Sequence, residues 1–111
     1  MLKEAKLALG LTTDAYDARL AALLDAGAKD LRSVGVEFTG TVSLTVASNG
    51  TVTDESTLDD NLVIEAILTY VMVHFGNPSN YAQLLESYDY QKKKLANTSA
   101  YTEWGEADAD S

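Results

Sequence analysis

The densest run of hydrophobic positions in the chain extends from residue 62 to residue 75 and stops at Gly76-Asn77-Pro78. Its strongly polar positions are Glu65, Thr69 and His74. At about 100° per residue, Glu65 and His74 lie on opposite sides of a helix, so a helix over this run has no continuous polar face. We therefore expect it to be covered on nearly every side, either by the rest of the chain or by another copy of the chain.

A second amphipathic segment follows this break. Pro78 cannot continue a helix, whereas Ser79 or Asn80 can cap a new one, and Asn97 is a reasonable place for it to end. Apolar residues that recur at helical spacing mark one side of a helix. In this segment they are Tyr81, Leu84, Leu85, Tyr88 and Leu95.

The amino-terminal part of the chain predicts two further helices. The first covers residues 2–9 and stops at Gly10, a residue type that favours the backbone conformation of helix ends. The second runs from about Tyr16 to Val34, follows capping groups at residues 12–14 and is closed by Gly35. Gly27 lies on its apolar stripe, where we interpret it as permitting close approach by a neighbouring helix; a tolerated defect is the alternative.

Residues 36–56 have a different pattern. Val42, Leu44 and Val46 alternate with Thr and Ser, and this period of two indicates a strand with one apolar face. Asn49-Gly50 is the strongest two-residue hairpin signal, and residues 51–53 can return as the partner strand. An isolated hairpin is marginal in water, so this one leans on the helices, pairs with something outside the chain, or is a mobile loop. We favour contact with a partner, through Leu44 and Val46.

The third helix is expected to begin near residues 57–60, where hydroxyl and carboxylate groups can cap its free amides. The sequence therefore predicts a mainly α fold. It is a small four-helix domain with a β-hairpin or extended insertion between the second and third helices and an extended C-terminal tail. Residues 1–97 form the helical domain, with residues 36–56 as its β-rich insertion, and residues 98–111 form an acidic C-terminal arm.

Composition narrows the class of protein. The chain has 111 residues, enough for one domain, and its 46% hydrophobic content excludes an intrinsically disordered chain. It has no cysteine, which removes disulfides, thiolate metal sites and cysteine nucleophiles. Its formal net charge of −9 argues against a nucleic-acid reader, because such proteins neutralise phosphates with basic residues. No signal-peptide pattern opens the chain, and a helix over residues 62–75, about 21 Å long, is too short for a bilayer core of about 30 Å.

Candidates for catalysis are few. His74 is the single histidine, and it lies inside the apolar run, where we interpret it as a structural residue rather than a catalytic base. No second histidine completes a metal site, and no glycine-rich phosphate loop occurs. Carboxylate pairs such as Asp59-Asp60 fall at a predicted helix start, where capping explains them. We therefore expect no enzyme activity, no metal and no cofactor.

Two groups of residues are candidates for contact with a partner. Lys92, Lys93 and Lys94 place three of the eight basic residues in one helical turn. Cations there suit the helix dipole, and the alternative is docking against a carboxylate-rich patch such as the acidic arm of a neighbouring copy. Tyr101 and Trp104 lie in the arm, outside any helical period, and aromatic residues of this kind anchor interfaces. Packing back onto their own domain is the competing interpretation.

The predicted third and fourth helices, LVIEAILTYVMVHFGNPSNYAQLLESYDYQKKKLA, resemble the phage head–tail connector (adaptor) proteins, a family also labelled phage DNA-packaging proteins. In that family a helix of type A-I-x-x-Y-x-x-x-x-F-G precedes one of type Y-x-x-x-Y-D-x-L-K-x-x-L. The opening stretch LKEAKLALGLTTDAYDARLAALLDAGAKDL also resembles the first two helices of the family. The departure is the 36–56 insertion, because relatives often have a shorter connection there. The matching positions are Ala66, Ile67, Tyr70, Phe75 and Gly76, then Ser87, Tyr88, Asp89, Lys92 and Leu95.

The resemblance implies a compact helical protomer that assembles into a ring, typically a dodecamer, beneath the portal protein. Such a ring lengthens the DNA channel and offers a platform for stopper or tail-completion proteins, while DNA passes through without sequence-specific binding. Residues 98–111 match an extension that can engage the portal in relatives. The protein would then belong to the neck of the virion, and to the host cytoplasm during assembly.

A ring also suits the physical pattern, because closed rings need two different, complementary surfaces on each copy. We expect this chain to carry more apolar surface than one copy can bury. The alternative from another class is a small acidic binding protein, monomeric or dimeric, such as a DNA-mimicking inhibitor, although the carboxylates are scattered rather than ordered on one face. A hydrolase is a third hypothesis, for which the chain lacks a nucleophile motif.

Overall fold

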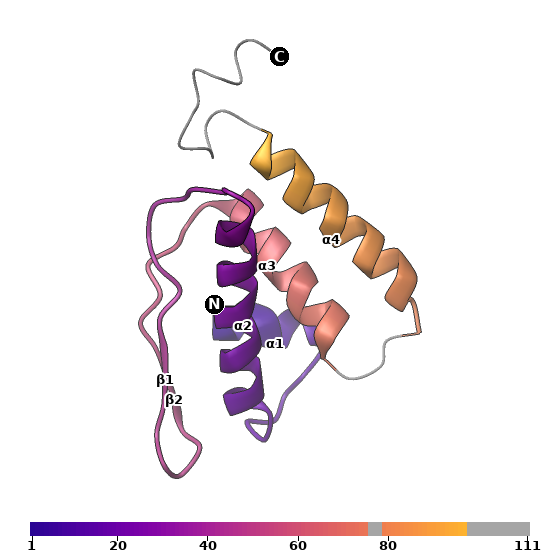
Figure 1. Ribbon diagram of the computed structural model, residues 1–111. Helices are drawn as coiled ribbons and strands as arrows, with labels where there is room; N and C mark the ends of the chain where they lie inside the picture. Colours follow the sequence, from indigo (N-terminus) through magenta and orange to yellow (C-terminus); the bar gives the residue numbers. More distant parts are fainter. Residues whose placement is uncertain (76–78, 98–111) are drawn as a thin grey trace.

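The computed structural model describes residues 1–75 and 79–97. It contains four helices, with a two-stranded antiparallel hairpin between the second and the third (Figure 1). This confirms the predicted fold class. The predicted arm at residues 98–111 lies outside the described residues. The elements are α1 Leu2–Leu9, α2 Asp17–Ser33, β1 Leu44–Val46, β2 Val52–Asp54, α3 Asn61–His74 and α4 Tyr81–Ala96.

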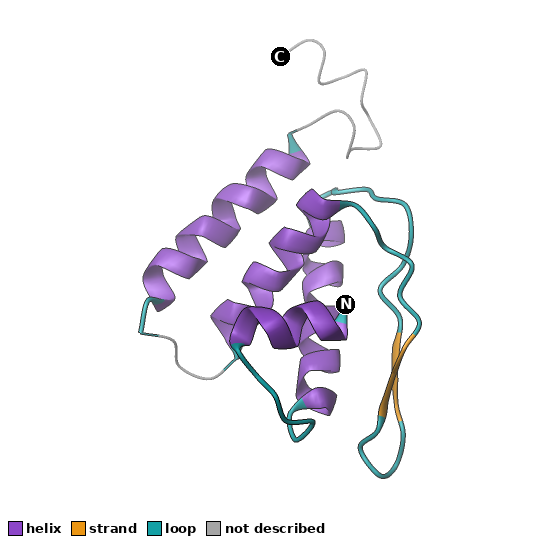
Figure 2. Ribbon diagram, turned by 180° about the vertical axis from the view of Figure 1, so that it is seen from behind, coloured by secondary structure: helices purple, strands orange, loops and turns teal. Residues whose placement is uncertain are grey.

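Helix α3 is the centre of the domain. It packs against α2 on one side and α4 on another, and α1 crosses it on a third (Figure 2). Six of its residues are buried, which is what its nearly all-apolar sequence requires: Val63, Ala66, Ile67, Thr69, Val71 and Val73. Thr69 is the polar member of this group, and its hydroxyl donates to the carbonyl of Glu65 at 2.9 Å. The chain itself therefore covers part of this helix, while Leu62 in its first turn stays 56% exposed.

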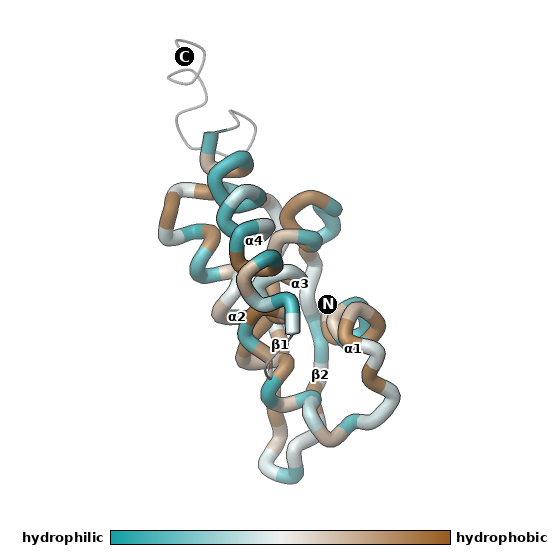
Figure 3. The backbone as a smooth tube through the Cα atoms, turned by 90° about the vertical axis from the view of Figure 1, so that its right-hand side faces the viewer, coloured by the Kyte–Doolittle hydropathy of each residue, from teal (hydrophilic) through white to brown (hydrophobic). Residues whose placement is uncertain are grey.

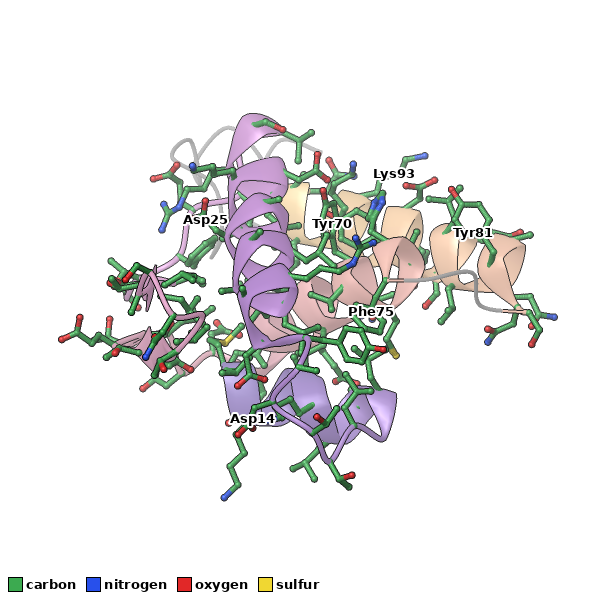
Figure 4. All side chains as sticks on the ribbon, turned by 90° about the horizontal axis from the view of Figure 1, so that it is seen from below. Asp14, Asp25, Tyr70, Phe75, Tyr81 and Lys93 are labelled. Atoms are coloured by element: carbon green, nitrogen blue, oxygen red, sulfur yellow. The ribbon has the colours of Figure 1, made fainter. Side chains whose placement is uncertain are left out.

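Helices α2 and α3 approach closely at Gly27. A Cβ at this position would lie 3.1 Å from Cδ1 of Tyr70 and 3.3 Å from Cγ2 of Ile67, tighter than ordinary van der Waals contact. The interpretation of Gly27 as a point of close approach is confirmed. Tyr70 fills the space between α2 and α4, and its ring meets that of Tyr88 at a centroid distance of 5.4 Å (Figure 4).

The helix ends agree with the sequence in part. Gly10 adopts the left-handed conformation (φ 70°) after α1, and the Asp60 carboxylate accepts hydrogen bonds from the amides of residues 62 and 63 at the start of α3. The capping expected at the start of α2 is wrong, because Tyr16 is its N-cap residue and makes no side-chain cap. Nearby, Asp14 forms an ion pair with Lys6 at 2.6 Å, and Asp17, the acidic residue in the first turn of α2, lies 3.2 Å from the same ammonium. Asn80 precedes α4, also without a side-chain cap.

The hairpin packs along α2 with one face (Figure 1). Its register pairs Leu44 with Asp54 and Val46 with Val52. The turn differs from the expected two-residue Asn-Gly turn: the amide of Gly50 donates to the carbonyl of Ala47, and Gly50 alone in this turn has positive φ. A turn of type I′ needs positive φ at both central residues, and here only Gly50 has it. The loop is therefore longer than a two-residue turn.

The hairpin is anchored at its open end. Gly40 lies so close to the segment before α3 that a Cβ at this position would be 2.9 Å from the Cα of Leu58. The φ of Gly40 is +84°. Val36 and Leu58, which flank the hairpin, are buried in the core. The carboxylate of Asp54 accepts from the amide of Leu2 at 2.8 Å and so ties the second strand to the start of α1.

Candidate partner interface

Helices α2 and α4 end at the same side of the molecule (Figure 1), and a partly buried polar contact joins them there. The hydroxyl of Tyr88 donates to the Asp30 carboxylate at 2.5 Å, and the Lys92 ammonium donates to the same oxygen at 3.1 Å. The Lys92 ammonium also lies 5.1 Å from the centre of the Tyr88 ring. The ring of Tyr88 is only 3% exposed, so this contact sits at the edge of the core.

The electrostatics of this contact follow from its geometry. Burial alone would raise the pKa of Asp30, but the hydrogen bonds from Tyr88 and Lys92 outweigh it and hold that pKa below its ordinary value. Burial, together with the hydrogen bond to Asp30, raises the pKa of the Tyr88 hydroxyl far above its ordinary value. Asp30 is therefore ionised and Tyr88 protonated at neutral pH, and the contact holds α4 against α2.

The three candidate lysines do not share one environment. Lys92 is committed to Asp30, as described above. Lys93 is exposed, labelled on α4 in Figure 4, and it lines a shallow groove of about 320 Å³ between the ends of α2 and α4. Lys94 lies in the last turn of α4 and has an interaction of its own. The groove is lined by Val34, Asp89, Lys92, Lys93 and Ala96.

The two candidate residues of the hairpin also differ. Leu44 is partly buried and packs against the core, whereas Val46 is 44% exposed. Leu44 thus already has contacts within the chain, and Val46 is the one that a second molecule can reach. Contact of either residue with a partner stays a prediction. Tyr101 and Trp104 lie outside the described residues.

The structure adds two exposed apolar positions that the sequence did not single out. Leu7 of α1 is 72% exposed and lines a groove with Lys3, and Tyr90 of α4 is 68% exposed and lines another with Glu86. Apolar positions on α1 are visible in Figure 3. Both residues lie off the buried stripes of their helices. Each has a charged residue four positions earlier on the same helix, of opposite sign in the two cases.

His74 is held by two contacts within the chain. Its ring lies tilted against that of Tyr70 at a centroid distance of 4.2 Å, and its carbonyl accepts from Arg19 at 3.3 Å. Within residues 1–75 and 79–97, no group of three histidine or acidic residues is placed to hold a metal ion. None of the helices in that same part of the chain is both long and apolar enough to cross a membrane.

Asp30 was not predicted from the sequence as a member of the α2–α4 contact. Tyr88 and Lys92 are four residues apart and could be paired from helical spacing, but Asp30 lies 58 residues away from Tyr88. The contact between Arg32 and Phe38, 3.9 Å from guanidinium carbon to ring centre, was missed as well. This contact could have been predicted from the sequence, because a cation and an aromatic residue lie a few positions apart on either side of a helix end.

Comparisons of the chain with protein-family models, with curated proteins and with solved structures found no match.

Proposed function

We propose that this chain is the subunit of a head–tail connector of a tailed phage, a non-enzymatic protein that assembles as a ring under the portal protein. The ring extends the DNA channel and docks stopper or tail-completion proteins. This places the protein in the neck of the virion, after assembly in the host cytoplasm.

The observation that carries the proposal is the agreement between the resemblance and the order of elements. The resemblance implies two opening helices, a connection that is often shorter in relatives, and a pair of helices separated by a break. The fold has this order, with α1 and α2, the hairpin, and then α3 and α4 (Figure 1). The residues that carry the resemblance also contribute to the core of the fold, since Ala66, Ile67, Tyr88 and Leu95 are buried.

The surface offers two different apolar positions for a ring contact. Leu7 with Lys3 lies on α1, and Tyr90 with Glu86 lies on α4, two helices that pack against different parts of the core. A ring joins unlike surfaces of successive copies, and here the charges beside the two apolar residues are complementary. The surplus of apolar surface is smaller than the sequence predicted, because part of α3 is covered within one copy. The argument for assembly therefore rests on these patches and on the resemblance.

Passage of DNA is supported by charge alone. A net charge of −9 per copy gives a ring that repels phosphates over distances of about a Debye length, roughly 10 Å at 0.1 M salt. DNA can then move through such a channel without sticking to its wall.

The test is a mass measurement of the protein alone and mixed with a purified portal protein. Native mass spectrometry is expected to detect either a ring of the free protein or a complex of many copies on the portal. Leu7→Asp should weaken this assembly, whereas Leu62→Asp, at a leucine that is 56% exposed outside both patches, should leave it intact. A protein that stays monomeric with the portal, and that is absent from virions, would refute the connector proposal. Tight binding to a DNA-handling enzyme would favour the DNA mimic instead.

The basic turn provides a second test of assembly. Replacing Lys92, Lys93 and Lys94 by glutamate is expected to weaken assembly and to reduce its dependence on salt. Because Lys92 also holds Asp30, the single variant Lys93→Glu separates an interface effect from loss of the internal contact. Unaltered assembly of Lys93→Glu across a salt series would remove this residue from the interface.

A further inference from the structure

A groove between the ends of α2 and α4 lies next to the start of the acidic arm. Its α4 wall consists of Asp89, Lys92, Lys93 and Ala96, which follow one another at spacings of three, one and three and so form a single strip of the helix. Its other wall is Val34, just after α2, with 45% of its surface exposed. The groove therefore combines an uncovered apolar side chain with two cations and one carboxylate.

We propose that this groove binds the acidic arm, residues 98–111, of the same chain. The arm contains four carboxylates and no basic residue, so its charge complements the lysines. It also contains Tyr101 and Trp104, aromatic side chains suited to cover an exposed valine. This inference does not depend on the connector proposal.

The lengths of the two partners agree. Asp89 and Ala96 are seven residues apart on a helix, about 10 Å at 1.5 Å per residue. Tyr101 and Trp104 are three residues apart, about 10 Å in an extended chain. The arm begins directly after Asn97, the residue that follows α4, so the length of chain between Ala96 and Tyr101 is enough for Tyr101 to reach the groove.

Because the arm and the groove belong to the same chain, the groove binds its own arm in preference to the arm of a neighbouring copy. A short flexible connection gives an effective concentration in the millimolar range. A shallow, partly polar groove with a dissociation constant of about 0.1 mM would therefore be mostly filled by its own arm. The same site would stay nearly empty toward the arms of other copies at micromolar protein.

The groove on α1 is a weaker candidate for the arm. It has Lys3 and Lys6 beside Leu7, and Lys6 pairs with Asp14 and Asp17 at 2.6 and 3.2 Å. Lys92 of the other groove is likewise paired with Asp30, so the lysines do not distinguish the two grooves. No comparable adjacency to the arm exists there, because the arm starts from the end of α4.

Trp104 is the only tryptophan of the chain, so its fluorescence reports on the arm of the intact protein. We expect its emission to be blue-shifted, and its quenching by acrylamide to be several-fold slower, in the native protein than in urea. Both properties should be independent of protein concentration. Val34→Asp and Lys93→Glu should each move the emission toward that of the unfolded chain.

Two control variants match these changes at other places. Val46→Asp alters a valine of equal exposure (44%) on the hairpin, and Lys29→Glu makes the same charge change at an exposed lysine of α2 that does not line the groove. Neither control should alter the emission. Circular dichroism checks that each variant keeps its helices, and Val34→Ser replaces Val34→Asp if the latter unfolds.

Three results would overturn the inference. The first is a native Trp104 as accessible to acrylamide as in urea. The second is burial that survives both groove variants, which would place the indole elsewhere. The third is burial that is lost on dilution, which would assign the contact to the arm of a second copy.

Discussion

The contact between Tyr88 and Asp30 makes a sharp prediction about how α4 is held. Tyr88→Phe removes only the hydroxyl that donates to the Asp30 carboxylate at 2.5 Å. The ring remains, so no cavity opens in the core and its packing against Tyr70 is kept. Any loss of stability then reports the hydrogen bond itself.

The expected magnitude follows from the charge and the exposure of the acceptor. A hydrogen bond to a charged group contributes about 1.5–3 kcal/mol to folding. Asp30 keeps its contact with Lys92 at 3.1 Å, and its side chain is 34% exposed, so water can replace part of the lost donor. We therefore expect Tyr88→Phe to lower the free energy of unfolding by about 1–2 kcal/mol, which reaches below the range for a fully buried contact.

Urea unfolding followed by circular dichroism at pH 7 measures this difference. Tyr90→Phe is the matched control, because Tyr90 is on the same helix and 68% exposed, and its hydroxyl should contribute less than about 0.5 kcal/mol. A double-mutant cycle with Asp30→Asn isolates the coupling between the two side chains. If Tyr88→Phe and Tyr90→Phe unfold at the same urea concentration, the contact does not stabilise the fold and the reasoning is refuted.

The same contact predicts a pH dependence with a definite sign. Because the pKa of Asp30 is lowered in the folded state, its contribution is complete above the ordinary value of 3.8 and is lost as the pH falls through the folded value. Because the pKa of Tyr88 is raised, its contribution is complete below the ordinary value of 10.0 and declines as the pH rises above it. The difference between the wild type and Tyr88→Phe should therefore be largest between these limits and shrink in acid and in strong base. A difference that stays constant from neutral pH down to pH values well below 3.8 would contradict the assignment to an ionised Asp30.

Three further predictions concern the backbone and its caps. Gly27→Val should lower the free energy of unfolding by about 1–3 kcal/mol, because the larger side chain overpacks against α3. Ala22→Val, at an exposed position of the same helix, is the control and should cost less than about 1 kcal/mol. Equal effects of the two changes would contradict the close approach of α2 and α3 at Gly27. Asp60→Ala should cost about 1 kcal/mol by removing the cap of α3, and the same change at the preceding, exposed aspartate is its control in thermal unfolding. Gly40→Ala should destabilise more than Gly50→Ala, because both have positive φ but only Gly40 faces backbone atoms within 3.0 Å; the reverse order in urea unfolding would refute this.

Several features were predictable because they depend on neighbours along the chain. The apolar run at 62–75 predicted a helix enclosed by other elements, and the cap of α3 at Asp60 was among the expected capping groups, because cap and amides are only a few residues apart. The alternation around Leu44 predicted a strand and its partner. Local patterns thus determined which segments form helices and strands.

Local signals failed where distant segments compete for the same side chain. Asp14 was among the capping groups expected at the start of α2, but Tyr16 is the N-cap residue there, and Asp14 pairs with Lys6 of α1 at 2.6 Å. Lys92 was a candidate for binding a partner, and the fold brings Asp30 next to it across 62 residues of sequence. The sequence alone does not show which carboxylate a lysine contacts once the helices are packed.

By itself the sequence determined the helices, the hairpin and a small four-helix domain, because hydrophobic periodicity and turn residues act over one or two turns of chain. Only the tertiary structure decided that one copy covers part of α3, that Lys93 faces a groove beside Val34, and that Leu7 and Tyr90 are left exposed. The physical reason is that burial depends on which faces of the helices meet in space, and helical spacing gives the faces but not their partners.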